Sequence, residues 1–251
     1  MSRVASYSVF IIIVVVLIFV VDWPLIGKNF FNLTVAGKLW PGVLHAAWNT
    51  IWYTLFAFSV GLVFAVIFAL MKMSKGPFKW FAVAYIELFR GMPALLTIFI
   101  CVFAIPLAFK IKLPGGTIGG GLIALILVTS AYTSEIIRAG IQAVPKGQTE
   151  AARSLGMPHL RTTITVILPQ AFRIVIPPLT NELVTLLKDT SLLYIAGMTI
   201  TAKELTTFGK DGVSTWGNST PYVVVAVVYL IITIPLTYLI GRLEKKMAVK
   251  K

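Results

Sequence analysis

The chain has 251 residues, of which 58% are hydrophobic and only 12% are charged, and its mean hydropathy is +0.90. This composition excludes an ordinary soluble domain and is typical of an integral membrane protein. The net charge of +13 fits an attraction to anionic lipid headgroups and requires no nucleic acid partner. The single cysteine, Cys101, lies in an apolar run, so the chain can form no internal disulfide and no cysteine-based metal site.

The first apolar run covers residues 9–21 and follows Arg3. A cleaved signal peptide and a retained signal anchor both show this pattern. No small-x-small cleavage site follows, because Asp22, Trp23 and Pro24 come next. We therefore expect a retained first span.

Five further apolar segments are long enough to cross about 30 Å of hydrocarbon. Their expected limits are residues 49–71, 80–109, 118–138, 179–198 and 221–240. The prolines expected to kink these helices are Pro93, Pro106, Pro177, Pro178 and Pro235. The sequence therefore predicts an all-α polytopic membrane protein with about six transmembrane helices, both termini on one side and no room for a sizeable soluble domain.

Lys and Arg residues near the span ends indicate the orientation, because cytoplasmic loops carry the excess of positive charge. Alternate connections divide these residues fourteen against six. The richer set is Arg3, Lys72, Lys75, Lys79, Arg138, Lys146, Arg153, Arg161, Arg173, Arg242, Lys245, Lys246, Lys250 and Lys251. The poorer set is Lys28, Lys38, Lys110, Lys112, Lys203 and Lys210. Both termini and the segment 139–178 are therefore expected in the cytoplasm.

A polar stretch from Pro145 to Gly156 lies between the fourth and fifth expected spans. A polar helical segment of this length lies outside the hydrocarbon, where it can contact a soluble partner. Pro145 suits the first turn of a helix, and Gly156 suits the left-handed residue that ends one. Pro158 is expected to begin a second short helix, which Pro169 bends or ends. The alternative is an amphipathic hairpin that rests on the lipid headgroups.

Ionisable residues inside the spans are costly unless they are paired or face an aqueous path. Two pairs have helical i, i+3 spacing near the cytoplasmic ends of their spans: Glu87 with Arg90, and Glu135 with Arg138. This spacing allows a salt bridge on one helix face. For these four residues we favour structural ion pairs over contact with a ligand.

A second polar stretch follows the two prolines at 177–178. The side chains expected to face a translocation path are Asn181, Glu182, Thr185 and Lys188. Helical spacing places Asn181, Thr185 and Lys188 on one stripe, and Glu182 with Asp189 on its neighbour. A zwitterionic amino acid needs donors for its carboxylate and acceptors for its ammonium group, and this stretch offers both. The alternative is helix packing in a dimer, with Lys188 paired to Asp189.

No phosphate-binding motif of the form G-x-x-x-x-G-K-[ST] occurs in the sequence, and the glycine cluster at residues 115–121 lacks the required lysine. We interpret this cluster as a flexible loop before a span. His45 and His159 are isolated and have no metal-binding spacing. The sequence therefore predicts no catalytic residue, no metal site and no cofactor bound by this chain, which is not expected to be an enzyme by itself.

The triplet Glu150-Ala151-Ala152 is followed by Gly156 and then by Val166-x-Leu168-Pro169. This pattern resembles the cytoplasmic "EAA" loop of the permease subunits of bacterial ATP-binding-cassette importers, which usually have Ile where Val166 stands. Flanking motifs resemble the polar amino acid branch of that family: Ala47-Ala-Trp-Asn-Thr-Ile, Tyr85-Ile-Glu-Leu-Phe-Arg-Gly-Met-Pro93, Ser134-Glu-Ile-Ile-Arg-Ala-Gly-Ile-Gln142, Leu168-Pro-Gln-Ala-Phe-Arg173 and Leu187-Lys-Asp-Thr-Ser-Leu192. The resemblance covers about residues 44–246.

The resemblance implies that the polar hairpin couples the membrane domain to a separate ATPase subunit. The implied coupling residues are Glu150, Ala151, Ala152, Arg153, Gly156, Leu168 and Pro169. ATP and Mg²⁺ would be held by the partner ATPase subunits, whose closure would carry the docked helices together and switch the spans from inward-facing to outward-facing. The other implied partners are a second permease subunit, identical or related, an external substrate-binding protein and the lipid bilayer.

The resemblance also implies a domain organisation and a location. Residues 1–43 would form an extra N-terminal span with an external loop, because the family core has five spans. Residues 44–246 would form the importer transmembrane domain, with the coupling segment at about 139–178, and residues 247–251 a basic tail. The location implied is the bacterial cytoplasmic membrane.

ATP-driven uptake of a polar amino acid is the implied function, with glutamate or glutamine as the first guess. A secondary transporter or channel is the alternative, but the sequence contains no convincing internal repeat. An intramembrane enzyme would need a nucleophile or a metal constellation, and neither is evident.

Overall fold

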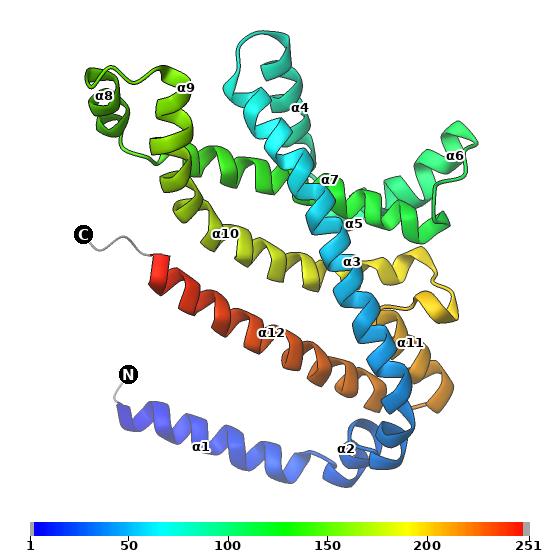
Figure 1. The fold of residues 1–251 in the computed structure, drawn as a ribbon. Coiled ribbons are helices and arrows are strands. Elements are labelled where there is room, and N and C mark those ends of the chain that lie inside the picture. The colour runs from blue at the N-terminus through cyan, green and yellow to red at the C-terminus, as the bar shows by residue number, and fades with distance from the viewer. Residues whose placement is uncertain (1–2, 248–251) are drawn as a thin grey trace.

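The computed structural model describes residues 3–247 (Figure 1). The α-helices are α1 (Arg3–Val20), α2 (Trp23–Phe30), α3 (Leu33–Met73), α4 (Pro77–Gly91), α5 (Ala94–Phe99), α6 (Ile105–Phe109), α7 (Gly116–Gln142), α8 (Lys146–Ser154), α9 (His159–Thr162), α10 (Leu168–Asp189), α11 (Leu205–Trp216) and α12 (Thr220–Met247). Two π-helical turns are η1 (Ile100–Ala104) and η2 (Thr163–Ile167), and two 3₁₀ turns are η3 (Thr190–Ala196) and η4 (Ile200–Ala202). The described residues form helices and no strand, so the all-α prediction is confirmed.

Four helical stretches of the described chain are long and apolar enough to cross a membrane. They are Trp23–Met73, Gly116–Gln142, His159–Ala196 and Thr220–Met247. A fifth crossing is obtained when Pro77–Gly91 and Ala94–Phe109 are counted as one bent span. The first apolar run forms the 18-residue helix α1, and its role as a retained span stays a prediction.

Several helices extend beyond their expected limits. α3 begins at Leu33 and contains Pro41, so the boundary expected after residue 43 falls inside a continuous helix. The expected span at 80–109 is broken instead of continuous, with a bend of 107° between α4 and α5. The break lies at Met92 and Pro93, because proline disfavours the helical conformation of the residue before it, and Met92 is extended with a ψ of 141°.

α7 lies at the centre of the bundle and packs most extensively against α3. The contact face of α3 carries small residues at helical spacing, with Ala57, Ala65 and Ala69 fully buried. Gly61 belongs to the same row, and a Cβ atom there would lie 3.4 Å from the side chain of Thr129. Small residues at this spacing let two membrane helices approach closely, which increases their packing contacts.

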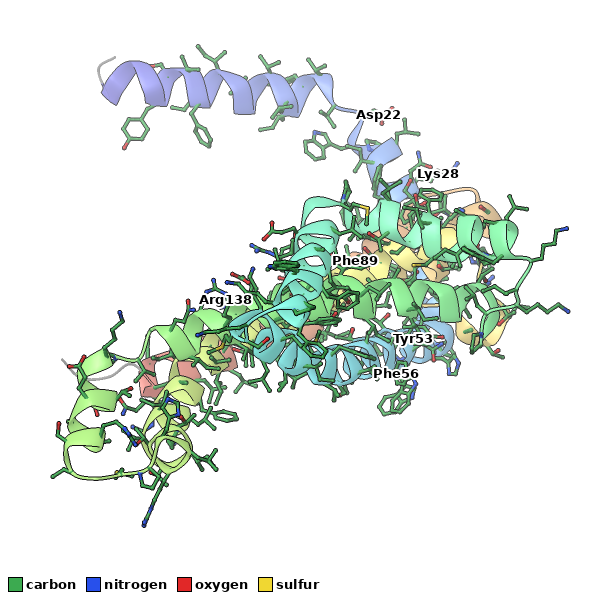
Figure 2. All side chains as sticks on the ribbon, turned by 90° about the horizontal axis from the view of Figure 1, so that it is seen from above. Asp22, Lys28, Tyr53, Phe56, Phe89 and Arg138 are labelled. Atoms are coloured by element: carbon green, nitrogen blue, oxygen red, sulfur yellow. The ribbon has the colours of Figure 1, made fainter. Side chains whose placement is uncertain are left out.

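Different helices lie at the two ends of the helical bundle (Figure 1). α8, α9, the N-terminal end of α1 and the C-terminal end of α12 lie at one end, while α2, α6 and α11 lie at the other. α1 stands off from the remaining helices, as the second view shows (Figure 2). The apolar side chains at residues 7–12 and 15–20 are exposed, with Phe19 at 84%.

Candidate functional site

The polar segment between α7 and α10 forms two short helices joined by a tight turn. α8 ends at Ser154, and Gly156 follows with a φ of +82°, the left-handed backbone that glycine adopts most readily. The N–H of Met157 donates to the Ala152 carbonyl at 3.1 Å, and the N–H of Gly156 donates to the Arg153 carbonyl at 2.9 Å. These hydrogen bonds give partners to backbone carbonyls in the last turn of α8.

The surface of this hairpin is apolar as well as charged. Ala152 is buried, and α8 packs on η2 and α9, whereas Glu150 and Ala151 are exposed. Leu155 and Leu160 flank the turn and are 85% and 71% exposed. The hairpin therefore presents neighbouring apolar side chains beside charged ones, a surface suited to a protein partner.

The second short helix begins after Pro158, as expected, but it does not end at Pro169. α9 continues through η2 into α10, so that one helical stretch runs from His159 to Ala196. In η2 the N–H of Leu168 donates to the carbonyl of Thr163, five residues earlier. Pro169 then stands in the first turn of α10, where its missing N–H is tolerated. Leu168 and Pro169 thus belong to the base of a span.

The expected ion pairs are formed only in part. Glu135 accepts from Arg138 Nε at 2.9 Å, and its other oxygen accepts from Lys72 Nζ at 2.9 Å. Glu87 lies 3.7 Å from Lys72 instead of pairing with Arg90, so the expected i, i+3 pair in α4 is wrong. An i, i+3 pair is worth only about 0.2–0.5 kcal/mol, and Lys72 of α3 offers Glu87 a partner between helices. Lys72 therefore links α3, α4 and α7, a role that the sequence analysis missed.

Two of the four expected path residues line a common cavity, while the other two face elsewhere. Glu182 and Thr185 line a cavity of about 290 Å³ together with Asp189. Lys188 lines a different cavity beside α12. Asn181 Nδ2 donates to a glutamate of α12 at 3.1 Å. The single stripe expected for Asn181, Thr185 and Lys188 is therefore wrong, because Thr185 lies between the two stripes and joins the acidic one.

The acidic cavity is lined by α5, α7, α10 and the break between α4 and α5. The α4–α5 break contributes Met92 and Pro93, α7 contributes Tyr132, and α10 contributes Glu182 and Asp189. Neither carboxylate takes part in an ion pair within the described residues. The volume is close to the lower limit of small-molecule sites, about 300 Å³. The cavity therefore has the size for one small polar molecule and two acceptors for its cationic group.

Residues 61–249 match the family described as "Binding-protein-dependent transport system inner membrane component". The chain belongs to this family. The matched range covers α7, the polar hairpin and the acidic cavity, whereas α1 and α2 precede it.

Similar proteins include amino acid permeases with different named substrates. The L-cystine transport system permease protein TcyB of Bacillus subtilis (strain 168) is 42% identical over 68% of this chain and 69% of its own length. The probable glutamine ABC transporter permease protein GlnM of the same organism is 38% identical over 80% and 90%. The arginine transport system permease protein ArtQ, also from that organism, is 34% identical over 75% and 84%.

Solved structures agree with this membership. A crystal structure described as an amino acid ABC transporter with histidines aligns at a TM-score of 0.76 and 36% identity, over 83% of this chain and 95% of that chain. The inward-facing MetNI methionine ABC transporter aligns at a TM-score of 0.67 and 15% identity, over 84% and 98%, and shares the fold. The chain is therefore the permease component of an amino acid ABC importer.

At the end of the permease opposite to the hairpin, α3 holds the backbone of η4. His45 Nε2 lies 2.9 Å from the Thr201 carbonyl, to which Asn49 Nδ2 also donates at 3.0 Å. The Tyr53 hydroxyl donates to the Ala202 carbonyl at 2.8 Å. These three side chains are four residues apart and share one helix face. His45 looked isolated in the sequence because its partner is a backbone group 156 positions away.

Glu204 is a further residue of the permease whose role the sequence did not reveal. It caps α11: its carboxylate accepts from the N–H groups of Thr206 and Thr207, each at 2.6 Å, and from the Thr207 hydroxyl at 2.6 Å. Burial raises the pKa of the Glu204 carboxyl above its ordinary value, although these hydrogen bonds act in the opposite direction. No helix was expected directly after residue 204, so the sequence showed no element for this residue to cap.

Proposed function

We propose that the permease moves a polar amino acid across the bacterial cytoplasmic membrane through the acidic cavity. The single observation that carries this proposal is the pair Glu182 and Asp189, which line one cavity without a cationic partner among the described residues. Carboxylates in hydrocarbon are costly unless they are paired or solvated, so a bound ammonium group compensates them. The hydroxyl groups of Thr185 and Tyr132 line the same cavity and donate to the Asn181 and Arg90 carbonyls, so their oxygens can accept a further hydrogen bond from the substrate ammonium group.

Of the two first guesses, the cavity favours glutamine over glutamate. A glutamate side chain would bring a third carboxylate beside Glu182 and Asp189, and like charges repel strongly away from water. Glutamine keeps the polar side chain without that charge. Asn181 and Lys188 face other surfaces, and the proposed path uses Glu182 and Thr185 without them.

Coupling to ATP is proposed to occur at the hairpin formed by α8 and α9. The docking residues are Glu150, Ala151, Ala152, Arg153 and Gly156, with Leu168 and Pro169 at the base of α10. The chain has no phosphate-binding loop, so ATP and Mg²⁺ belong to separate ATPase subunits. Because α9 is continuous with α10, a displacement of the docked hairpin is transmitted along one helical stretch to Glu182.

The proposed orientation places the hairpin end of the bundle in the cytoplasm. This end also holds the N-terminal end of α1 and the basic C-terminal end of α12, which supports a cytoplasmic location for both termini (Figure 1). A second permease subunit completes the membrane domain. An external substrate-binding protein delivers the amino acid to the opposite end.

The test is uptake by proteoliposomes that contain the permease with its ATPase, supplied with the external binding protein. We expect ATP-dependent accumulation of radiolabelled glutamine above glutamate. Replacing one acceptor of the ammonium group, by Glu182→Gln or Asp189→Asn, lowers uptake about tenfold, as expected for the loss of a charged hydrogen bond. Glu87→Gln is the matched control, because Glu87 also lies in a bent span but is largely exposed outside the cavity.

Two results would contradict the proposal. Uptake driven by an ion gradient without ATP would indicate a secondary transporter. Wild-type uptake by both cavity variants would show that Glu182 and Asp189 do not contribute to the transport path.

A further inference from the structure

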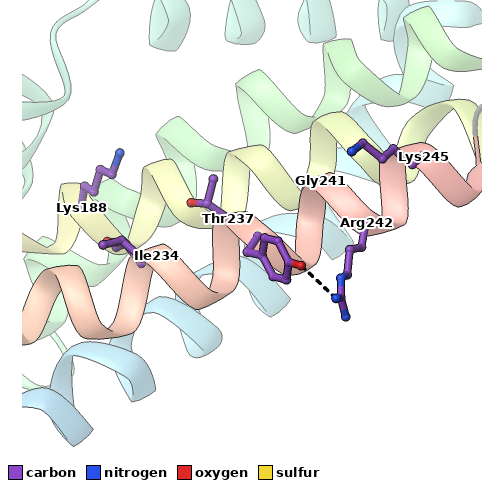
Figure 3. A pocket seen from close by; sticks show the side chains of 8 residues that line it. Lys188, Ile234, Thr237, Gly241, Arg242 and Lys245 are labelled. Atoms are coloured by element: carbon purple, nitrogen blue, oxygen red, sulfur yellow. Dashed lines mark hydrogen bonds between the residues drawn. The ribbon is translucent and has the colours of Figure 1, made fainter.

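A groove of about 700 Å³ runs between α10 and α12 and shares no lining residue with the acidic cavity. Arg242 and Lys245 lie toward one end of it, and Ile234 and Lys188 lie toward the other (Figure 3). No acidic residue lines the groove. It is therefore a cationic surface that neither the proposed substrate path nor the coupling hairpin uses.

The basic end of the groove is organised for an anion. The Arg242 guanidinium donates to the Tyr238 hydroxyl at 2.8 Å and lies 4.6 Å from the centre of the Tyr238 ring. This contact orients the planar guanidinium and leaves further N–H donors for a ligand. Lys245 lies one turn further along α12, and neither residue is in an ion pair within the described part of the chain.

The position along α12 places these charges at the level of lipid headgroups. α12 has 28 residues and therefore spans about 42 Å, against about 30 Å of hydrocarbon. Arg242 lies about 33 Å from the start of the helix by the same rise per residue. Ile234 and Tyr238 are 61% and 60% exposed, so an apolar wall continues from the charges into the hydrocarbon.

A second copy of the chain is a poor source of the anion, because most of its nine acidic residues are engaged. The engaged residues are Asp22 and Glu204 in helix caps, Glu87, Glu135 and Asp211 in ion pairs, and Glu244 in a hydrogen bond from Asn181. Glu182 and Asp189 line the acidic cavity, and Glu150 lies on the coupling hairpin. The surrounding bilayer supplies anionic phosphate groups attached to apolar chains, which match both parts of the groove.

We propose that this groove binds an anionic phospholipid, with its phosphate on Arg242 and Lys245 and an acyl chain along Ile234. Gly241 lies between these parts, and a Cβ atom there would meet nothing within 4 Å. The site is independent of the transported amino acid. Loss of lipid binding and loss of transport are therefore separate outcomes.

Native mass spectrometry of the permease purified with its ATPase tests the proposal, with phosphatidylglycerol and phosphatidylcholine as probes. We expect phosphatidylglycerol adducts on the wild type, and about fivefold weaker binding for each of Arg242→Gln and Lys245→Gln. Lys246→Gln is the matched control, because it removes the same charge from the same turn but does not line the groove. Gly241→Leu, which fills open space with a good helix former, blocks binding without removing charge.

Three results would overturn the proposal. Equal loss of phosphatidylglycerol binding in Lys245→Gln and Lys246→Gln would show that the lipid is held by general electrostatic attraction and not by the groove. Displacement of the lipid by millimolar inorganic phosphate would indicate a site for a soluble anion. A disulfide between two Thr237→Cys chains would show that a second copy occupies the groove.

Discussion

Glu204 shows most clearly what a single residue contributes to this permease. It is the one acidic or basic residue among the buried side chains of the described chain, with no exposed surface. Its carboxylate caps α11 and lies 3.4 Å from the Tyr229 hydroxyl of α12. One side chain therefore fixes the start of α11 and its position against α12.

We predict that Glu204→Ala lowers the free energy of unfolding by about 1 kcal/mol or more, because it removes an N-cap.

The raised pKa of Glu204 also predicts a pH dependence of the stability. The native state holds the proton on Glu204 more tightly than the unfolded state does. The stability that this proton contributes is therefore complete below an ordinary glutamate pKa of about 4.3, and it is lost as pH rises through the raised pKa of the native state. As pH rises, the thermal midpoint of the wild type in detergent should fall relative to that of Glu204→Gln. Parallel curves would contradict the prediction.

Individual site residues differ in how far the sequence could predict them. Glu135 and Arg138 are one turn apart, so helical geometry alone made their contact foreseeable. Lys72 contacts the same carboxylate from another helix, 63 positions away, and no local pattern encodes that contact. Glu182 was recognisable as a costly intramembrane charge, but its cavity is completed by two other parts of the chain, the α4–α5 break and α7.

Among the helical elements, the turn between α8 and α9 was predictable because its signals are local. Glycine in the left-handed conformation and proline at a helix start act within a few residues. The continuation of α9 through η2 into α10 was not predicted, because a π-helical turn has no simple sequence pattern and lets Pro169 enter the helix. The hairpin and the span are thus one mechanical element.

We predict that Gly156→Val weakens docking of the ATPase without affecting membrane insertion. A β-branched residue at a φ of +82° costs about 1–2 kcal/mol, which distorts the turn while the spans stay unchanged. Recovery of the ATPase with the tagged permease, at equal membrane levels, measures the effect. Gly147→Ala is the control, because Gly147 lies within α8 and a Cβ atom there meets nothing within 4 Å. Equal ATPase recovery with Gly156→Val would contradict the coupling proposal.

At the scale of the whole molecule, the permease is a helical bundle around α7 with different structural elements at its two ends. The hairpin and the basic end of α12 lie at one end, and the backbone clamp of α3 on η4 lies at the other. The acidic cavity lies between them, at the break of α4 and α5. α1 takes no part in this arrangement (Figure 2).

We predict that removal of residues 1–21 leaves the rest of the fold intact. The matched family range begins at residue 61, and α1 stands off from the bundle. Asp22 stays in the shortened chain because its carboxylate accepts from the N–H of Leu25 and caps α2. The expected result is an unchanged thermal midpoint and unchanged recovery of the ATPase. A lower midpoint would mean that α1 packs onto the assembled transporter.

The sequence by itself determined the class of protein, the approximate spans, the charge asymmetry and the two-helix hairpin, because hydropathy, charge and capping signals are local along the chain. Only the tertiary structure decided which polar groups meet. It placed Glu182, Thr185 and Asp189 in one cavity, turned Lys188 toward another groove, and gave Glu87 a partner in α3. The physical reason is that a helix face has no fixed neighbour until helices pack, and packing joins residues that are far apart in sequence.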